Sequence, residues 1–395
     1  MFYKLRRYKN YLGECIVYKI RALTLHLDTN RKFNSLDDFI DYLLPYLDKL
    51  DNLASEFSKE KKVLSKRLVF PSFEKLWKHI ENFNMSKVTD IENYVEKYVD
   101  FFNIPIIGWR TRIDYLNELP SIFAETRNFY TSLRIDKPPL FPSHYRQIVN
   151  LLKKISEVGG WDAATRFAFS FGPQPLTPYF PVAKSSGTGF SISLLYVNDL
   201  IENLSDSYDY KALEERIEEI ENEITTISIR LARKFKLPFL GVDLSLSPWL
   251  KESIVPLIEY FKENLTMGTV GSLNVIYEIN KVLRKLAKNP QVIGFNEIML
   301  PLAEDEGLKR RVRENDLSFR DFLAFCFVCT AGLDMIPIPE WTDIQVLLNL
   351  FYDLRAVYKI KKRTVGVRLI PVGAEPGEEI ELREFGNTPV LDVLK

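Results

Sequence analysis

The sequence of 395 residues predicts an α/β protein, and three observations lead to that fold class. A hydrophobic content of 46% is sufficient for a large buried core. Short runs of β-branched and aromatic residues alternate with longer segments of helical periodicity, which favours a parallel-rich sheet. No Pro/Gly-rich or low-complexity linker interrupts this series, so we expect one integrated domain over residues 1–395.

About ten strands are predicted from this alternation. The first is followed by a helix whose start has a capping residue, Ser35, and two acids in its first turn. A long charged helix is expected over residues 211–236 because glutamates, arginines and lysines recur there at helical spacing. The strands are predicted at residues 19–28, 66–70, 104–109, 132–135, 165–170, 190–195, 240–245, 292–297, 333–337 and 365–370.

The charge balance limits the classes of partner. Lysine and arginine together number 53, and so do aspartate and glutamate. Because no global field would attract a polyanion, we expect neither nucleic acid nor a membrane as a partner. No apolar run approaches the ~20 residues that span a bilayer, and residues 1–9 are not followed by the apolar stretch of a signal peptide.

The cysteine content indicates a cytoplasmic protein. The three cysteines, Cys15, Cys326 and Cys329, are too few and too irregular for a disulfide framework. We therefore expect the thiols to be reduced, as in the cytoplasm. We also expect the protein to assemble as a homo-oligomer. The many aromatic and charged residues are typical of heat-adapted proteins.

Two charged residues lie within apolar strands and are candidate site residues. Asp243 needs a cation, hydrogen bonds or a functional reason to be there; it either braces a neighbouring strand end or acts in catalysis. Arg368 likewise requires an anion. That anion is either an internal partner, Asp334 or Asp243, or the carboxylate or phosphate of a ligand.

A glycine turn precedes the helix expected over residues 273–288. Gly268, Thr269, Gly271 and Ser272 would present backbone N–H groups at a helix N-terminus, where the helix dipole favours an anion. The turn lacks the lysine of a Walker loop and the three glycines of a dinucleotide loop. The alternative is a simple glycine turn with Ser272 as the helix cap.

Three consecutive acids, Glu304, Asp305 and Glu306, follow the strand expected at residues 292–297. Paired carboxylates can bind a divalent metal or share a proton, and Glu297 and Asp243 would have to supply further ligands. The alternative is that acids are favoured in the first turn of a helix. Glu304 is also a candidate acid/base group.

Residues 326–334 end an apolar helix, pass a glycine and enter a strand that contains Asp334. The Cys-x-x-Cys spacing alone is weak evidence for redox chemistry, because a redox pair normally lies at a helix N-terminus. Zinc would need ligands that the sequence lacks. We interpret Cys326 as a core residue, and keep Cys329 and Asp334 as candidate catalytic residues.

Taken in order, residues 239–248, 300–307, 328–336 and 367–371 resemble the domain of unknown function 711 family. The likeness is specific in a second half of about 163–395 and weaker in a first half of about 1–162. It implies a ten-stranded α/β barrel of the pyruvate formate-lyase and anaerobic ribonucleotide reductase type. In that architecture two five-stranded parallel halves are joined antiparallel.

The sequence departs from the radical enzymes of that type at two places. The C-terminal glycine, Gly386, lies in Glu-Phe-Gly-Asn-Thr and not in Arg-Val-x-Gly-aromatic, and no convincing cysteine loop is present. Residues 127–132 also contain aromatic residues where related sequences often have a cysteine. No glycyl radical is therefore expected, and the family has no reaction to transfer.

Two hypotheses remain. The first is an enzyme, or former enzyme, that binds a small anionic metabolite in the barrel mouth through Arg368 and the Gly268–Ser272 turn. Its catalytic residues would be Asp243, Glu304, Cys329 and Asp334, and a divalent metal would bind at Glu304 and Asp305. The second is a non-catalytic ligand-sensing or assembly protein, in which the same charges are internal braces.

Overall fold

The computed structural model describes residues 18–108, 113–136, 142–204, 208–329 and 332–394. Several sequence expectations fall outside these residues. They are the basic first nine residues, Cys15, the end of the predicted strand at Trp109, and Thr330 and Ala331 of the Cys329–Asp334 turn.

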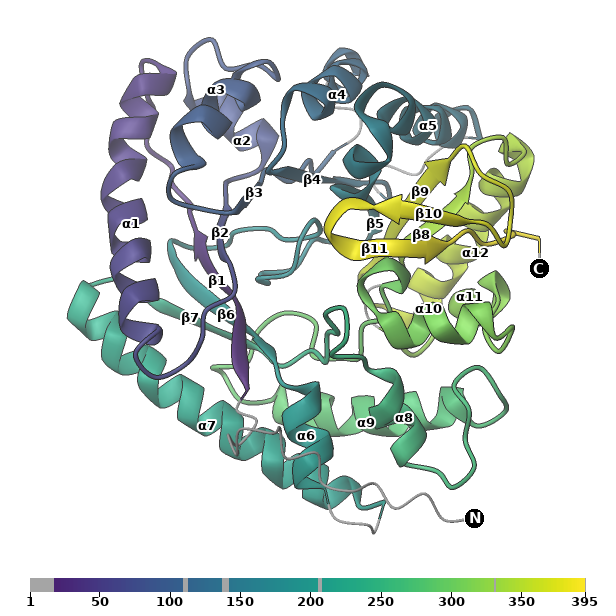
Figure 1. Ribbon diagram of the computed structural model, residues 1–395. Coiled ribbons are helices and arrows are strands. Elements are labelled where there is room, and N and C mark those ends of the chain that lie inside the picture. Colours follow the sequence, from purple (N-terminus) through teal and green to yellow (C-terminus); the bar gives the residue numbers. More distant parts are fainter. Residues whose placement is uncertain (1–17, 109–112, 137–141, 205–207, 330–331, 395) are drawn as a thin grey trace.

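The fold is mixed α/β, with helices surrounding a large sheet (Figure 1). The prediction for the first helix is confirmed, because the Ser35 Oγ accepts a hydrogen bond of 3.1 Å from the Asp38 N–H. The long charged helix is also present, one residue earlier than expected. The helices are α1 (Leu36–Phe57), α2 (Phe73–His79), α3 (Lys87–Val95), α4 (Ile113–Glu125), α5 (Pro142–Thr165), α6 (Val197–Asn203), α7 (Tyr210–Phe235), α8 (Val255–Tyr260), α9 (Ser272–Leu286), α10 (Glu306–Arg313), α11 (Phe319–Phe325) and α12 (Ile344–Lys361), with 3₁₀ turns η1 (Leu302–Glu304) and η2 (Arg383–Phe385).

Nine strands form one sheet in the order β7-β6-β1-β2-β3-β4-β5-β9-β8. β1 to β5 are parallel to one another, as are β6 with β7 and β8 with β9. The β1–β5 group meets the other two pairs antiparallel, at β1–β6 and at β5–β9. The strands are β1 (Lys19–His26), β2 (Lys66–Val69), β3 (Phe101–Asn103), β4 (Phe129–Arg134), β5 (Phe167–Phe171), β6 (Gly189–Leu195), β7 (Phe239–Asp243), β8 (Gly332–Pro339) and β9 (Val365–Val372), and β10 (Glu379–Leu382) pairs with β11 (Gly386–Pro389).

Two strand predictions need correction. The strand expected at residues 104–109 lies earlier, at β3, because Pro105 has no N–H to donate to a ladder; only Ile106 keeps an isolated bridge, to Leu133. Residues 292–297 form no continuous strand. This segment instead makes isolated parallel bridges from Val292 and the neighbouring Ile298 to residues 242 and 246, at the β7 edge of the sheet.

The segment after residue 298 reaches the other edge of the sheet. Pro301 makes an isolated parallel bridge to Asp334 of β8. Residues 292–301 therefore lie between the two edge strands, β7 and β8, and touch both. The hairpin of β10 and β11 was not expected from the sequence.

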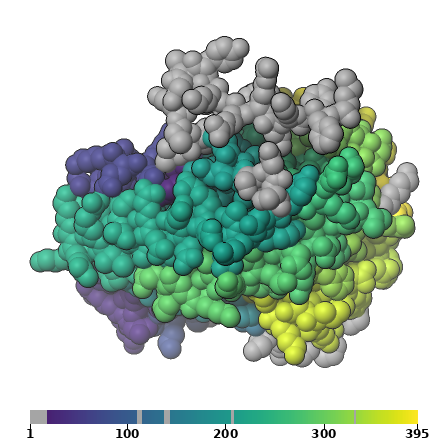
Figure 2. Space-filling view, turned by 90° about the horizontal axis from the view of Figure 1, so that it is seen from below, coloured from purple at the N-terminus to yellow at the C-terminus, as the bar shows by residue number. Residues whose placement is uncertain are grey.

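Buried side chains from both halves of the chain form one main cluster between the sheet and the helices. In the space-filling view the N-terminal purple segments and the C-terminal yellow segments lie on opposite sides, with the middle of the chain between them (Figure 2). Among the described residues, no helix combines the length and the apolar character needed to cross a bilayer.

Candidate functional site

The loop between β5 and β6, residues 172–188, lies on the inner face of the curved sheet (Figure 1). Gln174 donates to the backbone oxygen of Ile106 beyond β3, and the Ser185 hydroxyl donates to the oxygen of Val69 in β2. The Thr177 hydroxyl of the same loop donates to Asp243 of β7, an edge strand of the sheet. One loop thus contacts strands from distant parts of the sheet, which places it inside the curve.

Polar side chains share this inner face. Thr24 of β1 pairs in register with Ser191 of β6, and both are fully buried. His26 shares a hydrogen bond of 2.7 Å with the Ser191 hydroxyl, and burial lowers the pKa of His26 to about 3. The histidine is therefore neutral and structural. The inside of the sheet is not an ordinary apolar core.

Two irregularities in the strands direct charged side chains to this inner face. The β1–β6 register shifts between Ile20 and Ala22, so Arg21 is the additional residue of a bulge. The β8–β9 register shifts between Leu333 and Ile336, so that Asp334 and its left-handed neighbour lie opposite Arg368. Bulges of this kind redirect side chains and are frequent beside active sites.

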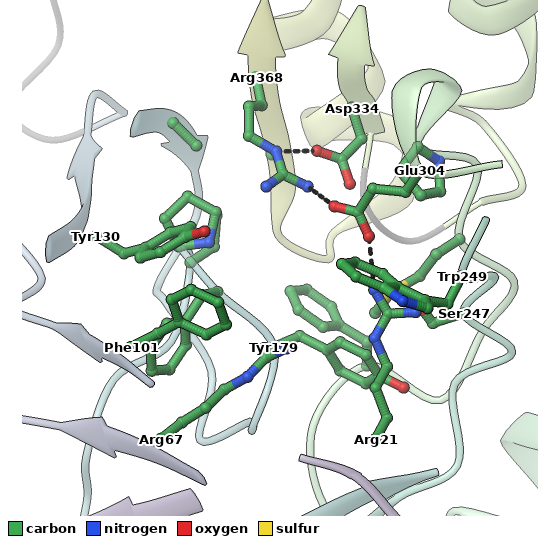
Figure 3. A pocket seen from close by; sticks show the side chains of 18 of the residues that line it. Arg21, Arg67, Phe101, Tyr130, Tyr179, Ser247, Trp249, Glu304, Asp334 and Arg368 are labelled. Atoms are coloured by element: carbon green, nitrogen blue, oxygen red, sulfur yellow. Dashed lines mark hydrogen bonds and ion pairs between the residues drawn. The ribbon is translucent and has the colours of Figure 1, made fainter. Parts of the chain in front are cut away.

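These residues form a buried ion cluster around Glu304 of η1 (Figure 3). Arg368 donates to Asp334 at 2.6 Å and to Glu304 at 3.0 Å. The other oxygen of Glu304 accepts from Arg21 at 2.5 Å. Glu304 thus joins an arginine of the first strand to one of the ninth.

The pKa values of this cluster follow from burial and from charge. Burial alone would raise the pKa of Glu304, but the charges of Arg368 and Arg21 outweigh it and hold that pKa below its ordinary value. At Asp334 burial prevails over Arg368, and the pKa is raised. Glu304 is therefore the firmly ionised member of the pair.

The cluster forms part of the wall of a cavity of about 70 Å³, which we call the inner cavity. Cations and carboxylates lie on its wall beside several aromatic rings, and Figure 3 shows Arg67, Phe101 and Tyr130 facing Arg21, Trp249 and Glu304 across it. We define it by Arg21, Arg67, Phe101, Tyr130, Tyr179, Trp249, Glu304, Asp334, Arg368 and Glu384.

Arg67 of β2 differs from the other two arginines of the cavity. Its guanidinium donates to the hydroxyl of Ser65 at 3.1 Å and to the backbone oxygen of Pro178 at 3.3 Å. Within the described part of the chain it has no carboxylate partner, and its Nη2 has no acceptor. Burial, followed by the nearby charge of Arg21, lowers the pKa of Arg67 to about 10. Arg67 is thus a cation with bonding capacity to spare.

Aromatic rings hold Arg67 and Tyr130 in place. The Arg67 guanidinium carbon lies 5.7 Å from the ring centre of Phe101 and 5.3 Å from that of Phe180. Tyr130 packs against the same two rings, at 5.4 and 5.7 Å. Burial raises the pKa of Tyr130 to about 12, so its hydroxyl stays protonated and can donate to an anion.

Asp243 is fully buried but does not line the inner cavity. It accepts five hydrogen bonds, from the N–H groups of Ser245, Phe295 and Asn296 and from the hydroxyls of Ser245 and Thr177. Gly294, with φ of +86°, permits this contact, since a Cβ there would lie 1.9 Å from the carboxylate. The geometry is that of a brace between β7 and the 292–301 segment.

Cys329 is likewise buried away from the cavity, with an exposed fraction of 1%. Cys326 caps α11 and Cys329 follows in the next turn, so both lie just after the helix and not in its last turn. A hydrogen bond from Cys326 and the charge of Lys361 lower the pKa of Cys329. The thiol nevertheless lies apart from Arg368 and Glu304.

The Gly268–Ser272 turn is also outside the inner cavity. The N–H groups of Gly268, Thr269 and Ser272 donate within the turn, to the Ser272 hydroxyl and to the backbone oxygens of residues 266 and 269. Gly271 is the N-cap and Ser272 the first residue of α9. The turn therefore uses these donors itself, but the expected helix cap at Ser272 is wrong, because Gly271 occupies the N-cap position.

The three consecutive acids point to different partners. Asp305 caps α10, accepting from the N–H groups of Gly307 at 2.7 Å and Leu308 at 3.2 Å, while Glu306 pairs with Lys309. Only Glu304 faces the inner cavity. Within the described ranges no three His, Cys, Asp or Glu side chains are grouped as a metal site requires.

The structure thus brings together Glu304, Asp334 and Arg368 from the predicted set, and adds Arg21 and Arg67. Arg21 lies within the largely apolar β1, so the signal that singled out Arg368, a fixed cation inside an apolar strand, was available for it too. Arg67 follows Lys66 at the charged start of β2 and gave no such signal. Tyr130, Tyr179 and Trp249 had no such signal, because aromatic residues are common throughout the chain.

Comparison with known proteins agrees with the resemblance seen in the sequence. A UPF0210 protein of Methanopyrus kandleri is 29% identical over 207 residues, which cover 50% of this chain and 45% of the relative. A UPF0210 protein of Streptococcus suis is 28% identical over 301 residues, or 70% of this chain and 66% of the relative. The match therefore spans about half to two thirds of these relatives. The model of the family described as "Uncharacterised ACR (DUF711)" matches residues 17–383, and the chain belongs to that family.

Proposed function

We propose that the protein binds a small carboxylate or phosphate anion in the inner cavity, with Arg67 as the main cation. The observation that carries this proposal is the unused bonding capacity of Arg67 beside two arginines that are already paired. Arg67 is partly buried, and a cation withdrawn from water without a carboxylate partner is costly unless a ligand supplies the charge. A planar guanidinium also matches carboxylate and phosphate oxygens.

The pairing of the wall charges supports an anion at Arg67. Arg21 and Arg368 are held by Glu304 and Asp334, whereas Arg67 has no carboxylate partner among the described residues. Glu384 is a third carboxylate on the wall, and burial and the nearby charge of Asp162 raise its pKa. Tyr130 adds a neutral hydrogen-bond donor. Low-dielectric walls strengthen the attraction of such a cavity for an anion.

The same wall supplies groups for proton transfer, which favours the enzyme hypothesis over pure sensing. Glu384, with its raised pKa, and the Tyr130 hydroxyl both line the cavity and interact electrostatically. Asp243 and Cys329 lie outside this cavity, so we assign them no part in it. Incubating the protein with a bound anion and following the ligand by NMR separates turnover from simple binding.

We also propose that the sheet closes into the ten-stranded barrel that the family resemblance implies, as one domain. The bridges of residues 292–301 to both edge strands support closure. The contacts of the 172–188 loop with β2 and β7 support an enclosed interior. The two parallel groups, joined antiparallel, fit two five-stranded halves if residues 292–301 take the tenth position.

Thermal-shift screening tests the binding proposal. We expect phosphate or short carboxylates at millimolar concentration to raise the melting temperature, since a ligand at ~100 times its dissociation constant adds ~2.7 kcal/mol. Arg67→Gln should abolish that shift. Arg233→Gln, on the exposed face of α7, is the matched control and should retain it. A shift that persists in Arg67→Gln would refute the role of Arg67.

A further inference from the structure

A second and larger space adjoins the inner cavity. This outer chamber has a volume of about 880 Å³ and shares with the inner cavity Arg21, Arg67, Phe101, Trp249, Glu384 and Phe385. The shared side chains form a neck between the two spaces. The inner cavity is much the smaller, at about 70 Å³. Since an apolar cavity of about 150 Å³ holds benzene, the inner one has room only for a head group of a few atoms.

The neck combines three aromatic rings, those of Phe101, Trp249 and Phe385, with the charged side chains of Arg21, Arg67 and Glu384. Trp249 contacts Phe385 edge to face, with ring centres 5.8 Å apart, and lies 4.9 Å from the guanidinium carbon of Arg21. Phe101 of β3 faces Trp249 and Arg21 in Figure 3. A hydrocarbon chain would gain contact with these rings. The aromatic part of the neck therefore suits the apolar middle of a ligand.

A strained turn fixes one wall of the neck. Leu250 has a φ of +52°, a conformation that a leucine rarely adopts. The Leu250 N–H donates to the backbone oxygen of Glu304 at 2.6 Å, and the backbone oxygen of Leu250 accepts from the Glu306 N–H at 3.0 Å. The turn is thereby tied to the residue that pairs with Arg21 and Arg368. It places Trp249 at the neck and Lys251 at the outer chamber.

The outer chamber also has cations with no carboxylate partner. Lys19 pairs with Glu252 at 3.7 Å, and Glu306 pairs with Lys309. Lys62 and Lys251 line the same chamber, and in the ranges described neither forms an ion pair. Unpaired cations therefore occur at both ends of the neck, Arg67 inside and these two lysines outside.

We propose that the ligand is an elongated dianion. One carboxylate or phosphate group binds Arg67 in the inner cavity, an apolar chain passes the neck, and a second anionic group binds Lys62 and Lys251. This inference rests on the proposed function and adds the chemical class of the ligand to it. α,ω-Dicarboxylates are the simplest probes of that class.

Calorimetric titration can test this with two matched series of probes, the dicarboxylates from succinate to sebacate and the monocarboxylates of the same chain lengths. A dicarboxylate long enough to pass the neck should bind about threefold to tenfold more tightly than its monocarboxylate, as expected for two partly exposed ion pairs. The double variant Lys62→Gln/Lys251→Gln should remove this difference. Lys288→Gln/Lys359→Gln, exposed and outside the chamber, should preserve it.

The outcomes separate the two proposals. Equal affinities at every chain length, or a difference that survives loss of both lysines, would overturn the dianion inference and leave the anion site intact. Loss of both series in Arg67→Gln supports the proposed function. If neither series binds the unmodified protein at millimolar concentration, the proposed function fails as well.

Discussion

Asp243 and Glu304 are both buried carboxylates in segments that resemble the family, yet their surroundings differ. Asp243 is surrounded by hydrogen-bond donors and does not line the inner cavity. Glu304 is held by two guanidinium groups at the wall of the inner cavity. Burial of a carboxylate is thus no guide to function on its own. Its hydrogen-bond and ion-pair partners, and whether it lines a cavity, indicate whether it acts as a brace or belongs to a site.

The physical difference lies in what each carboxylate leaves unsatisfied. Five donors on neighbouring segments satisfy Asp243. The ion pairs of Glu304 use only part of the positive charge around the cavity, because Arg67 stays unpaired beside them. We therefore expect changes at Asp243 to affect stability and changes around Glu304 to affect ligand binding as well.

The largest effect is expected for Asp243→Ala. Each buried donor left without an acceptor costs about 1–3 kcal/mol, so the free energy of unfolding should fall by about 5 kcal/mol. Chemical denaturation measures this directly. Asp353→Ala, on the exposed face of α12, should change it by less than about 0.5 kcal/mol. A mild effect at Asp243 would mean that the carboxylate is not a brace.

Glu304→Gln should have a smaller effect on stability and a distinct effect on binding. Removing one partner of a buried ion pair costs about 3–5 kcal/mol, because Arg21 and Arg368 lose their shared anion. The same cations then become available to phosphate. Phosphate should therefore raise the melting temperature of Glu304→Gln more than that of the unmodified protein. An equal or smaller rise would contradict this electrostatic account.

A modest effect is expected for Tyr130→Phe. Its hydroxyl is the neutral donor proposed for the bound anion, and loss of such a hydrogen bond costs about 0.5–1.5 kcal/mol. Phosphate affinity, measured by calorimetry, should fall a few-fold while the melting temperature of the free protein hardly changes. Tyr94→Phe, on the exposed face of α3, is the control. Unchanged affinity in Tyr130→Phe would remove this residue from the site.

The smallest effect concerns pH, where the two carboxylates should act in opposite directions. Arg368 and Arg21 hold the pKa of Glu304 below its ordinary value of 4.5, so its stabilising contribution is present above that value and is lost as pH falls through the lowered pKa. Burial raises the pKa of Asp243 above 3.8, so its contribution is present below 3.8 and is lost as pH rises through the raised pKa.

Denaturation at several pH values measures this contrast in Glu304→Gln and Asp243→Asn. Relative to the unmodified protein, Glu304→Gln should lose less stability as the solution becomes acidic. Asp243→Asn should lose less as pH rises from 3.8. Identical pH profiles for the two variants would show that the carboxylates do not differ as described.

The sequence alone determined the positions of most strands and some of the site. Alternating apolar segments predicted eight of the strands in place or nearly so, because burial between a sheet and helices requires that pattern. Charges inside apolar strands identified Asp243 and Arg368, and Asp334 was named as a possible partner of Arg368, which the structure confirms. Local patterns suffice for these features because their cause is local.

Only the tertiary structure decided which charges meet at a cavity. Arg21 and Glu304 are 283 positions apart, and the bulges that turn Arg21 and Asp334 inward have no clear signature in the chain. A shift of one residue in register moves a side chain to the opposite face of a sheet. The pairing of distant strands therefore decided that Arg67 lines the inner cavity. The same pairing, together with the 172–188 loop, decided that Asp243 is a brace outside that cavity.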